Sequence, residues 1–116
     1  MPLTFDSGEL LARLDGDWDF LGETVQMLSE DGIRLLGEIR QAALDGDAAG
    51  VGSAAHTLKG MLSNFCAAAS VAAALDLERL GKAGDFAAAP AAIDVLEARL
   101  SALIAELTEF LVTRPR

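Results

Sequence analysis

Residues 20–44 read FLGETVQMLSEDGIRLLGEIRQAAL, and their apolar positions follow one face of an α-helix. Apolar side chains recur every three or four residues, at Leu21, Val25, Leu28, Leu35, Ile39 and Ala42. Gly32 lies on the same line. A spacing near 3.6 residues places these positions on a single stripe, which a helix buries against its neighbours. The stretch therefore predicts a long amphipathic helix.

Three later stretches show the same spacing. One contains Val51, Ala55, Leu58, Leu62 and Phe65. A weaker one contains Ala69, Ala73, Leu77 and Leu80. The last contains Ile93, Leu96, Leu100, Leu103, Leu107 and Phe110. Nowhere do β-branched residues alternate with polar ones over the length of a strand, so no sheet is predicted.

Short turns separate these stretches. Asp-Gly-Asp occurs at residues 15–17, where it ends a short first helix over about residues 7–14, and again at residues 45–47. In each case the second Asp is a good N-cap for the helix that follows. Gly81 and Gly84 end the fourth helix, and Pro90 suits the first turn of the last.

Four long helices joined by short turns predict an all-α fold. The expected architecture is an antiparallel up-down-up-down four-helix bundle with a short additional N-terminal helix. A length of 116 residues fits one domain, spanning residues 1–116.

Charge and composition exclude several classes of protein. The formal net charge is −9, with nine basic residues scattered among eighteen acidic ones, which argues against binding to nucleic acid. No stretch approaches the roughly 20 apolar residues of a membrane span. The N-terminus lacks a basic region followed by an apolar run, so we expect no secretory signal and a cytoplasmic protein.

His56 is the single histidine of the chain. On a helical wheel with Leu58 facing the core, His56 lies about 160° away, on the outer face. Its neighbours at three, four and seven residues are Ala49, Gly52, Ser53, Lys59, Gly60 and Ser63. Five of these six are small, so a second protein could reach the imidazole, and Lys59 could offset negative charge arriving there. The spacing alone leaves two interpretations open, an ordinary surface residue and a phosphoryl acceptor.

The motif His-x-x-Lys-Gly at His56, Lys59 and Gly60, with Leu77-Glu78 in the next helix, resembles a known family. It is similar to the histidine-containing phosphotransfer (HPt) domain of multistep two-component phosphorelays, over essentially the whole chain. Two positions depart from the family pattern. Cys66 stands where a glycine usually turns the chain out of the histidine helix, and Ser70 stands at a usually apolar position. We therefore expect the histidine helix to run on by a turn, with Ser70 capping the next helix.

The resemblance implies a phosphocarrier without an active site of its own. His56 would accept a phosphoryl group from a receiver-domain aspartyl phosphate, or from a kinase, and relay it to another receiver aspartate. Lys59 would stabilise the phosphoryl oxygens, and Gly60 would clear space for the partner. The remaining expected binding residues are Ser63, Asn64, Ser53 and Gly52.

The partners implied are response-regulator receiver domains and a hybrid sensor histidine kinase. The protein would act as a monomer, bind no metal or cofactor itself, and rely on Mg²⁺ in the receiver. Leu10, Leu11 and Leu14 would either form an apolar docking patch or pack in the core.

The competing interpretation is an adaptor without chemistry. A helical bundle of this kind, or a degenerate HPt domain, could bind a receiver or kinase through the His56 face without being phosphorylated. An enzyme with its own active site is disfavoured, because the sequence has no nucleophile–base pair, phosphate-binding glycine loop or second histidine. A di-iron or haem bundle would need ligands on the core face, whereas His56 is expected to point outward.

Overall fold

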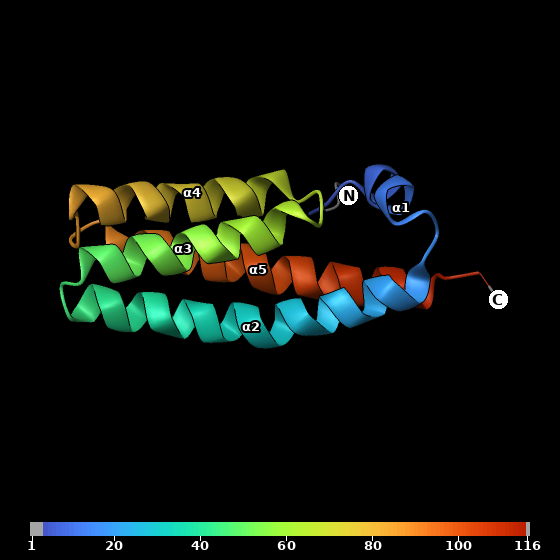
Figure 1. Ribbon diagram of the computed structural model, residues 1–116, viewed down its shortest axis with the longest axis horizontal. Coiled ribbons are helices and arrows are strands. Elements are labelled where there is room, and N and C mark those ends of the chain that lie inside the picture. The colour runs from blue at the N-terminus through green and yellow to red at the C-terminus, as the bar shows by residue number, and fades with distance from the viewer. Residues whose placement is uncertain (1–3, 116) are drawn as a thin grey trace.

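The computed structural model describes residues 4–115 (Figure 1). It contains the helices α1 (Ser7–Leu14), α2 (Trp18–Leu44), α3 (Ala48–Ser63), α4 (Ala68–Ala83) and α5 (Ala89–Val112). No strand occurs in the described residues. None of their helices is long and apolar enough to cross a bilayer.

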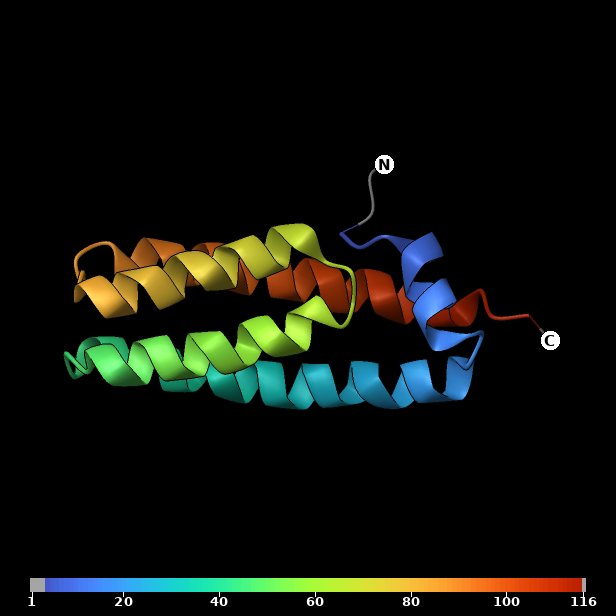
Figure 2. The same ribbon diagram turned by 45° about the horizontal axis from the view of Figure 1, so that its top comes forward.

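Helices α2 to α5 form the predicted antiparallel four-helix bundle (Figure 1). The molecule is elongated, at 50 × 24 × 19 Å. Helices α2 and α5 have 27 and 24 residues, whereas α3 and α4 have 16 each. The longer pair therefore continues past the end of α3 and α4, and α1 lies against this extension (Figure 2). Phe110 of α5 packs there against both Phe5 and Trp18, at ring-centroid distances of 5.4 and 5.1 Å.

The predicted N-caps are confirmed. The Asp17 carboxylate accepts a hydrogen bond from the Phe20 amide, and the Asp47 carboxylate accepts one from the Gly50 amide. Pro90 lies in the first turn of α5. Such caps satisfy backbone N–H groups that have no partner within the helix and are each worth about 1 kcal/mol.

The core consists mainly of the predicted stripes. Every predicted position on α2 and α3 is buried, and so is every one on α5 except the half-buried Phe110. The prediction for α4 is partly wrong, because Ala69 is exposed and Leu80 is only half-buried. The buried line of α4 comprises Ser70, Ala73, Ala74, Leu77, Glu78 and Gly81. Gly81 therefore lies inside α4, which ends instead at Gly84, with φ +66°.

The turn between α3 and α4 also differs from expectation. Helix α3 ends at Ser63 and does not run on, and Ser70 is a buried residue of the first turn of α4 rather than its cap. Cys66 has a φ of +56°, the left-handed conformation that glycine adopts most easily. Its carbonyl accepts a hydrogen bond from the Asp6 amide, and its neighbour Phe65 is buried in the core. Tertiary contacts thus hold the cysteine in a conformation that it does not favour.

This conformation leads to a stability prediction. A non-glycine residue with left-handed backbone angles costs roughly 1–2 kcal/mol. Glycine avoids this cost, but it offsets part of the gain because it is more flexible in the unfolded chain. We expect Cys66→Gly to be more stable than Cys66→Ala by about 1 kcal/mol in urea unfolding. The alanine variant is the matched control, because it also lacks the thiol but keeps the strained φ. Equal stability of the two variants would contradict the prediction.

Candidate functional site

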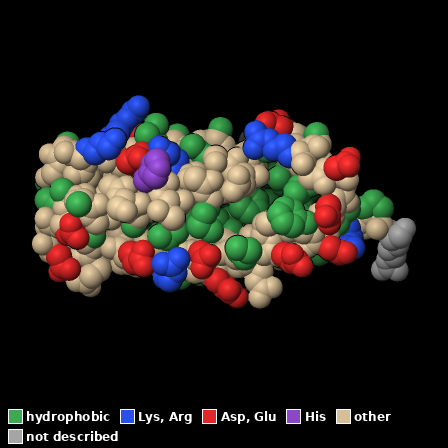
Figure 3. All heavy atoms as spheres, in the orientation of Figure 1, with side chains coloured by type: hydrophobic (Ala, Val, Ile, Leu, Met, Phe, Trp, Pro, Cys, Tyr) green, Lys and Arg blue, Asp and Glu red, His purple; other side chains and the backbone are tan. Residues whose placement is uncertain are grey.

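His56 lies midway along α3 on the outward face, as the helical wheel predicts. Its side chain is 68% exposed, whereas Ala55 and Leu58 on either side are buried in the core. Figure 3 shows the imidazole at the surface, beside acidic and basic side chains. The ring is therefore accessible to a second protein.

One carboxylate holds the imidazole in place. Oxygen Oε1 of Glu78, on α4, lies 2.6 Å from His56 Nδ1. The other oxygen, Oε2, accepts a hydrogen bond of 2.7 Å from Lys59 Nζ. Glu78 is only 7% exposed although it is charged, and Lys59 is half-buried at 26%. The three residues thus form a bridge between α3 and α4, with Glu78 at its centre.

The bridge favours the ionised form of Glu78 and determines which tautomer a neutral His56 adopts. The hydrogen bond from Lys59, followed by that from His56, lowers the pKa of the Glu78 carboxyl below its ordinary value, although burial acts in the opposite direction. An ionised carboxylate can only accept hydrogen bonds, so Nδ1 of a neutral His56 must be the nitrogen that carries hydrogen. Nε2 then has the free lone pair. Of the two ring nitrogens, Nε2 is therefore the one that could act as a nucleophile.

The other predicted site residues lie along α3 and at its C-terminal end. Gly60 is exposed, and a Cβ atom there would meet nothing within 4 Å. Ser53 is exposed on the other side of His56. Gly52 is half-buried where α3 meets α4, so it belongs to the helix–helix contact rather than to the open surface.

Ser63 and Asn64 lie two turns beyond His56, at the end of α3. The Ser63 hydroxyl donates a hydrogen bond of 2.7 Å to the Gly60 carbonyl, and its own carbonyl accepts one from Arg13 of α1. Asn64 is the C-cap of α3. Both residues are exposed but belong to the rim of the surface rather than to the bridge.

An apolar groove of about 390 Å³ lies beside this rim, between α1, α2 and the end of α3. Its lining includes Leu14, Phe20, Met27, Met61 and Asn64. Phe20 and Met27 are more than half exposed, and Figure 3 shows hydrophobic side chains gathered on the same face as His56. Leu10 is buried in the core and Leu14 packs against it, and both also line the groove. Leu11 is half-buried and lines no part of the groove.

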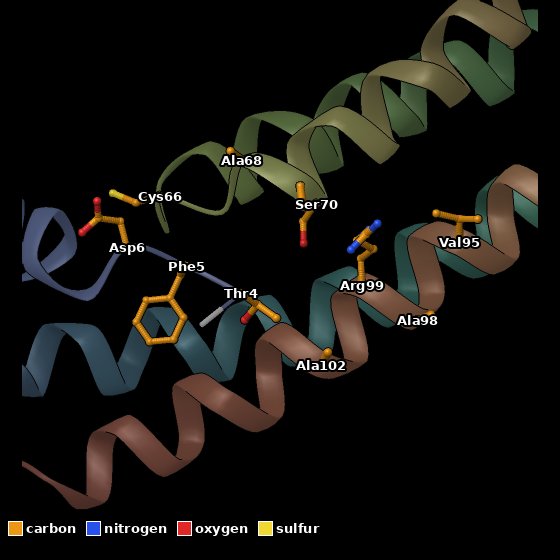
Figure 4. Close-up of a pocket in the computed structure, with 11 residues that line it drawn as sticks. Thr4, Phe5, Asp6, Cys66, Ala68, Ser70, Val95, Ala98, Arg99 and Ala102 are labelled. Carbon is orange, nitrogen blue, oxygen red and sulfur yellow. The ribbon is translucent and has the colours of Figure 1, made fainter. Parts of the chain in front are cut away.

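A larger cavity of about 750 Å³ lies elsewhere, between the N-terminal segment, the start of α4 and α5 (Figure 4). Phe5, Ser70, Val95 and Arg99 line it. Ser70 and Glu78 are eight residues apart on α4, which corresponds to about 12 Å along a helix. The cavity is therefore separate from the His56 bridge. Across residues 4–115, no three His, Cys, Asp or Glu side chains are grouped as metal ligands.

Sequence reasoning did not predict the contact between Glu78 and His56, although Leu77-Glu78 was part of the recognised motif. One signal was present in the sequence. Glu78 lies four residues after Ala74 and three before Gly81, so this charged residue shares a helix face with two small ones. A carboxylate on such a face is costly to bury unless it has a partner across the helix interface.

Comparison with known proteins agrees with this geometry. Residues 23–106 match the model of the Hpt domain family. The chain belongs to this family. The crystal structure of histidine-containing phosphotransfer protein B (HptB) from Pseudomonas aeruginosa PAO1 has the same fold, with a TM-score of 0.86 at 23% identity over 97% of this chain and 96% of that one. A sequence comparison with curated proteins finds no significant match.

Membership of the Hpt family defines the broad function. Hpt domains carry a phosphoryl group on a histidine within phosphorelays, and they interact with receiver domains and kinases. They are phosphocarriers rather than enzymes with an active site of their own. The predicted fold class and family are therefore confirmed.

The lowered pKa of Glu78 predicts how stability changes with pH. In the folded state the carboxyl binds its proton more weakly than in the unfolded chain, so it adds stability above its ordinary pKa of 4.5, and this stability is lost as pH falls further. We expect the unfolding free energy of wild type minus that of Glu78→Gln to decrease as pH drops below about 4.5, measured by urea unfolding between pH 6 and 3. Parallel pH profiles for the two proteins would contradict this.

Proposed function

We propose that His56 is the phosphoryl acceptor of this Hpt domain and relays the group between receiver-domain aspartates. The observation that supports this most strongly is the imidazole itself, which is 68% exposed and bound at Nδ1 by Glu78. Its free lone pair at Nε2 is thereby directed outward, toward an incoming partner. The other histidine nitrogen is not available for attack.

The transfer would proceed by in-line displacement at phosphorus. The Nε2 lone pair attacks the phosphorus of the aspartyl phosphate, an N–P bond forms and the P–O bond to the aspartate breaks. The bonding electrons of that P–O bond return to the aspartate as carboxylate. The imidazole gains positive charge in this step, because Nδ1 keeps its hydrogen. The Glu78 carboxylate, 2.6 Å from Nδ1, stabilises that charge. Transfer to a second receiver is the same reaction reversed.

Lys59 has two tasks in this proposal. Its ammonium group binds Glu78 Oε2 and so keeps the carboxylate ionised. The same charge lies one turn from His56 and attracts the phosphoryl oxygens when they arrive. Gly60 and Ser53 leave the surface on either side of the imidazole open. Mg²⁺ would be held by the receiver, where it neutralises charge on the transferring group.

The apolar groove between α1, α2 and α3 is proposed as the docking surface for the receiver. It lies on the same face as His56, and its exposed Phe20 and Met27 offer the apolar area that a transient interface needs. Both Lys59 and Glu78 come from the same chain as His56, so the site is complete in one copy. We therefore propose that the protein works as a monomer.

Phosphoryl uptake tests the function directly. Wild type mixed with a phosphorylated receiver and Mg²⁺ should take up label that is labile in acid and stable in alkali, whereas His56→Gln should take up none. Glu78→Gln should still be labelled, but roughly ten- to a hundredfold more slowly, because the orientation and charge stabilisation of the ring are weakened. A folded wild type that binds receivers but takes up no label would instead support the adaptor interpretation.

The docking surface has its own test. We expect Met27→Ser to raise the receiver concentration needed for half-maximal transfer several-fold, with little change in the rate at saturation, because only binding is weakened. Ile33→Ser is the matched control, since Ile33 is on the same helix and is 64% exposed compared with 56% for Met27, but lies outside the groove. Equal effects of the two variants would exclude this groove as the docking surface.

A further inference from the structure

Helices α3 and α4 approach one another closely at a pair of glycines. A Cβ atom on Gly81 of α4 would lie 2.7 Å from the Gly52 nitrogen, 3.1 Å from the Gly52 Cα and 3.1 Å from the Ala48 carbonyl oxygen. All three atoms belong to the backbone of α3, which cannot turn aside as a flexible side chain can. The helices can therefore be this close only if residue 81 has no side chain.

This contact lies next to the His56 bridge. Gly52 is four residues before His56 on α3, and Gly81 is three residues after Glu78 on α4. Because the two helices are antiparallel, both displacements point in the same direction, and the glycine contact is about one helical turn from the bridge. The separation of the helix backbones at Gly81 thus determines how far the Glu78 side chain must reach to His56.

We propose that Gly81 is a positioning residue for phosphotransfer, because its missing side chain lets Glu78 reach His56 Nδ1. This inference rests on the proposed role of His56 and extends it to a residue that touches neither the imidazole nor the phosphoryl group. The reach of a glutamate is fixed by its two methylene groups. A small retreat of α4 therefore lengthens the 2.6 Å contact to His56 and the 2.7 Å contact to Lys59 together.

Gly81→Ala is the decisive variant. The new methyl group would force the helices to separate or slide until it reaches ordinary contact distances of 3.4 Å or more. The imidazole would then lose its carboxylate partner and exchange between its two neutral tautomers.

Gly52→Ala is a matched control on the other side of the same contact. A Cβ atom on Gly52 would meet only the Glu78 carbonyl oxygen, at 3.9 Å, which is an ordinary contact. Both variants replace glycine by alanine inside a helix and gain about the same intrinsic helix propensity, roughly 1 kcal/mol. Only Gly81→Ala must move the helices, so a difference between the two isolates the effect of helix separation.

The first measurement is the nitrogen NMR spectrum of the protein labelled with ¹⁵N-histidine, which reports on His56 alone because the chain has one histidine. At a pH where the ring is neutral, wild type and Gly52→Ala should show a protonated Nδ1 and an unprotonated Nε2. Gly81→Ala should show a mixture of tautomers, as should Glu78→Ala, which serves as the reference for a ring without its partner. This readout needs no phosphoryl donor.

The second measurement is the rate of phosphoryl uptake from a phosphorylated receiver. Gly81→Ala should be slower than Gly52→Ala by on the order of ten- to a hundredfold. Circular dichroism of each variant tests whether it is folded. If Gly81→Ala is partly unfolded, all spectra and rates are compared in trimethylamine N-oxide, which favours the folded state.

The proposal is overturned if Gly81→Ala keeps the wild-type tautomer or the wild-type rate, or if Gly52→Ala changes both as much. Failure of the proposed function looks different. In that case wild type takes up no label at all, while the NMR comparison still reports whether Gly81 controls the contact between Glu78 and His56.

Discussion

The Glu78 carboxylate is the group on which the site depends. A charged side chain at a helix interface is costly to desolvate unless each oxygen has a partner. Here one oxygen faces Lys59 Nζ and the other faces His56 Nδ1, and both partners come from α3. The interactions that compensate for burying the charge therefore include the one that orients the His56 imidazole. The stability of the α3–α4 pair and the orientation of the imidazole are coupled through a single side chain.

The four long helices contribute differently to the apolar core and to the His56 site. Helices α2 and α5 are long and rich in buried leucine and isoleucine, so they supply much of the apolar burial. Helices α3 and α4 meet through alanine and glycine, which bury less area but bring two backbones close together. Close backbones allow a short acidic side chain to cross from α4 to α3. The same lack of bulk leaves the His56 side chain 68% exposed on the outer surface.

The buried faces predicted from the sequence were more accurate for α2, α3 and α5 than for α4. On α2, α3 and α5 large apolar residues alternate with polar ones, so the buried face could be read from the spacing. Five of the first seven residues of α4 are alanine, in a run that begins before the helix at Ala67, and alanine is compatible with either face. The predicted stripe was consequently displaced toward Ala69, and the buried positions of Ser70 and Glu78 were missed. The prediction for the turn at Cys66 was wrong for a related reason. Burial of Phe65 and the contact with Asp6 outweighed the local preference against a positive φ.

The sequence by itself determined the helical content, the caps at Asp17 and Asp47, the outward position of His56 and the family motif around it. These depend on contacts between residues close in the chain, which helical periodicity and capping encode directly. The tertiary structure alone decided that Glu78, 22 residues away, is the partner of His56, and that Gly81 lies inside α4, against the backbone of α3. Both depend on how α4 is rotated and how near it lies to α3. Those quantities are set by packing of the whole bundle, and an alanine-rich sequence does not specify them locally.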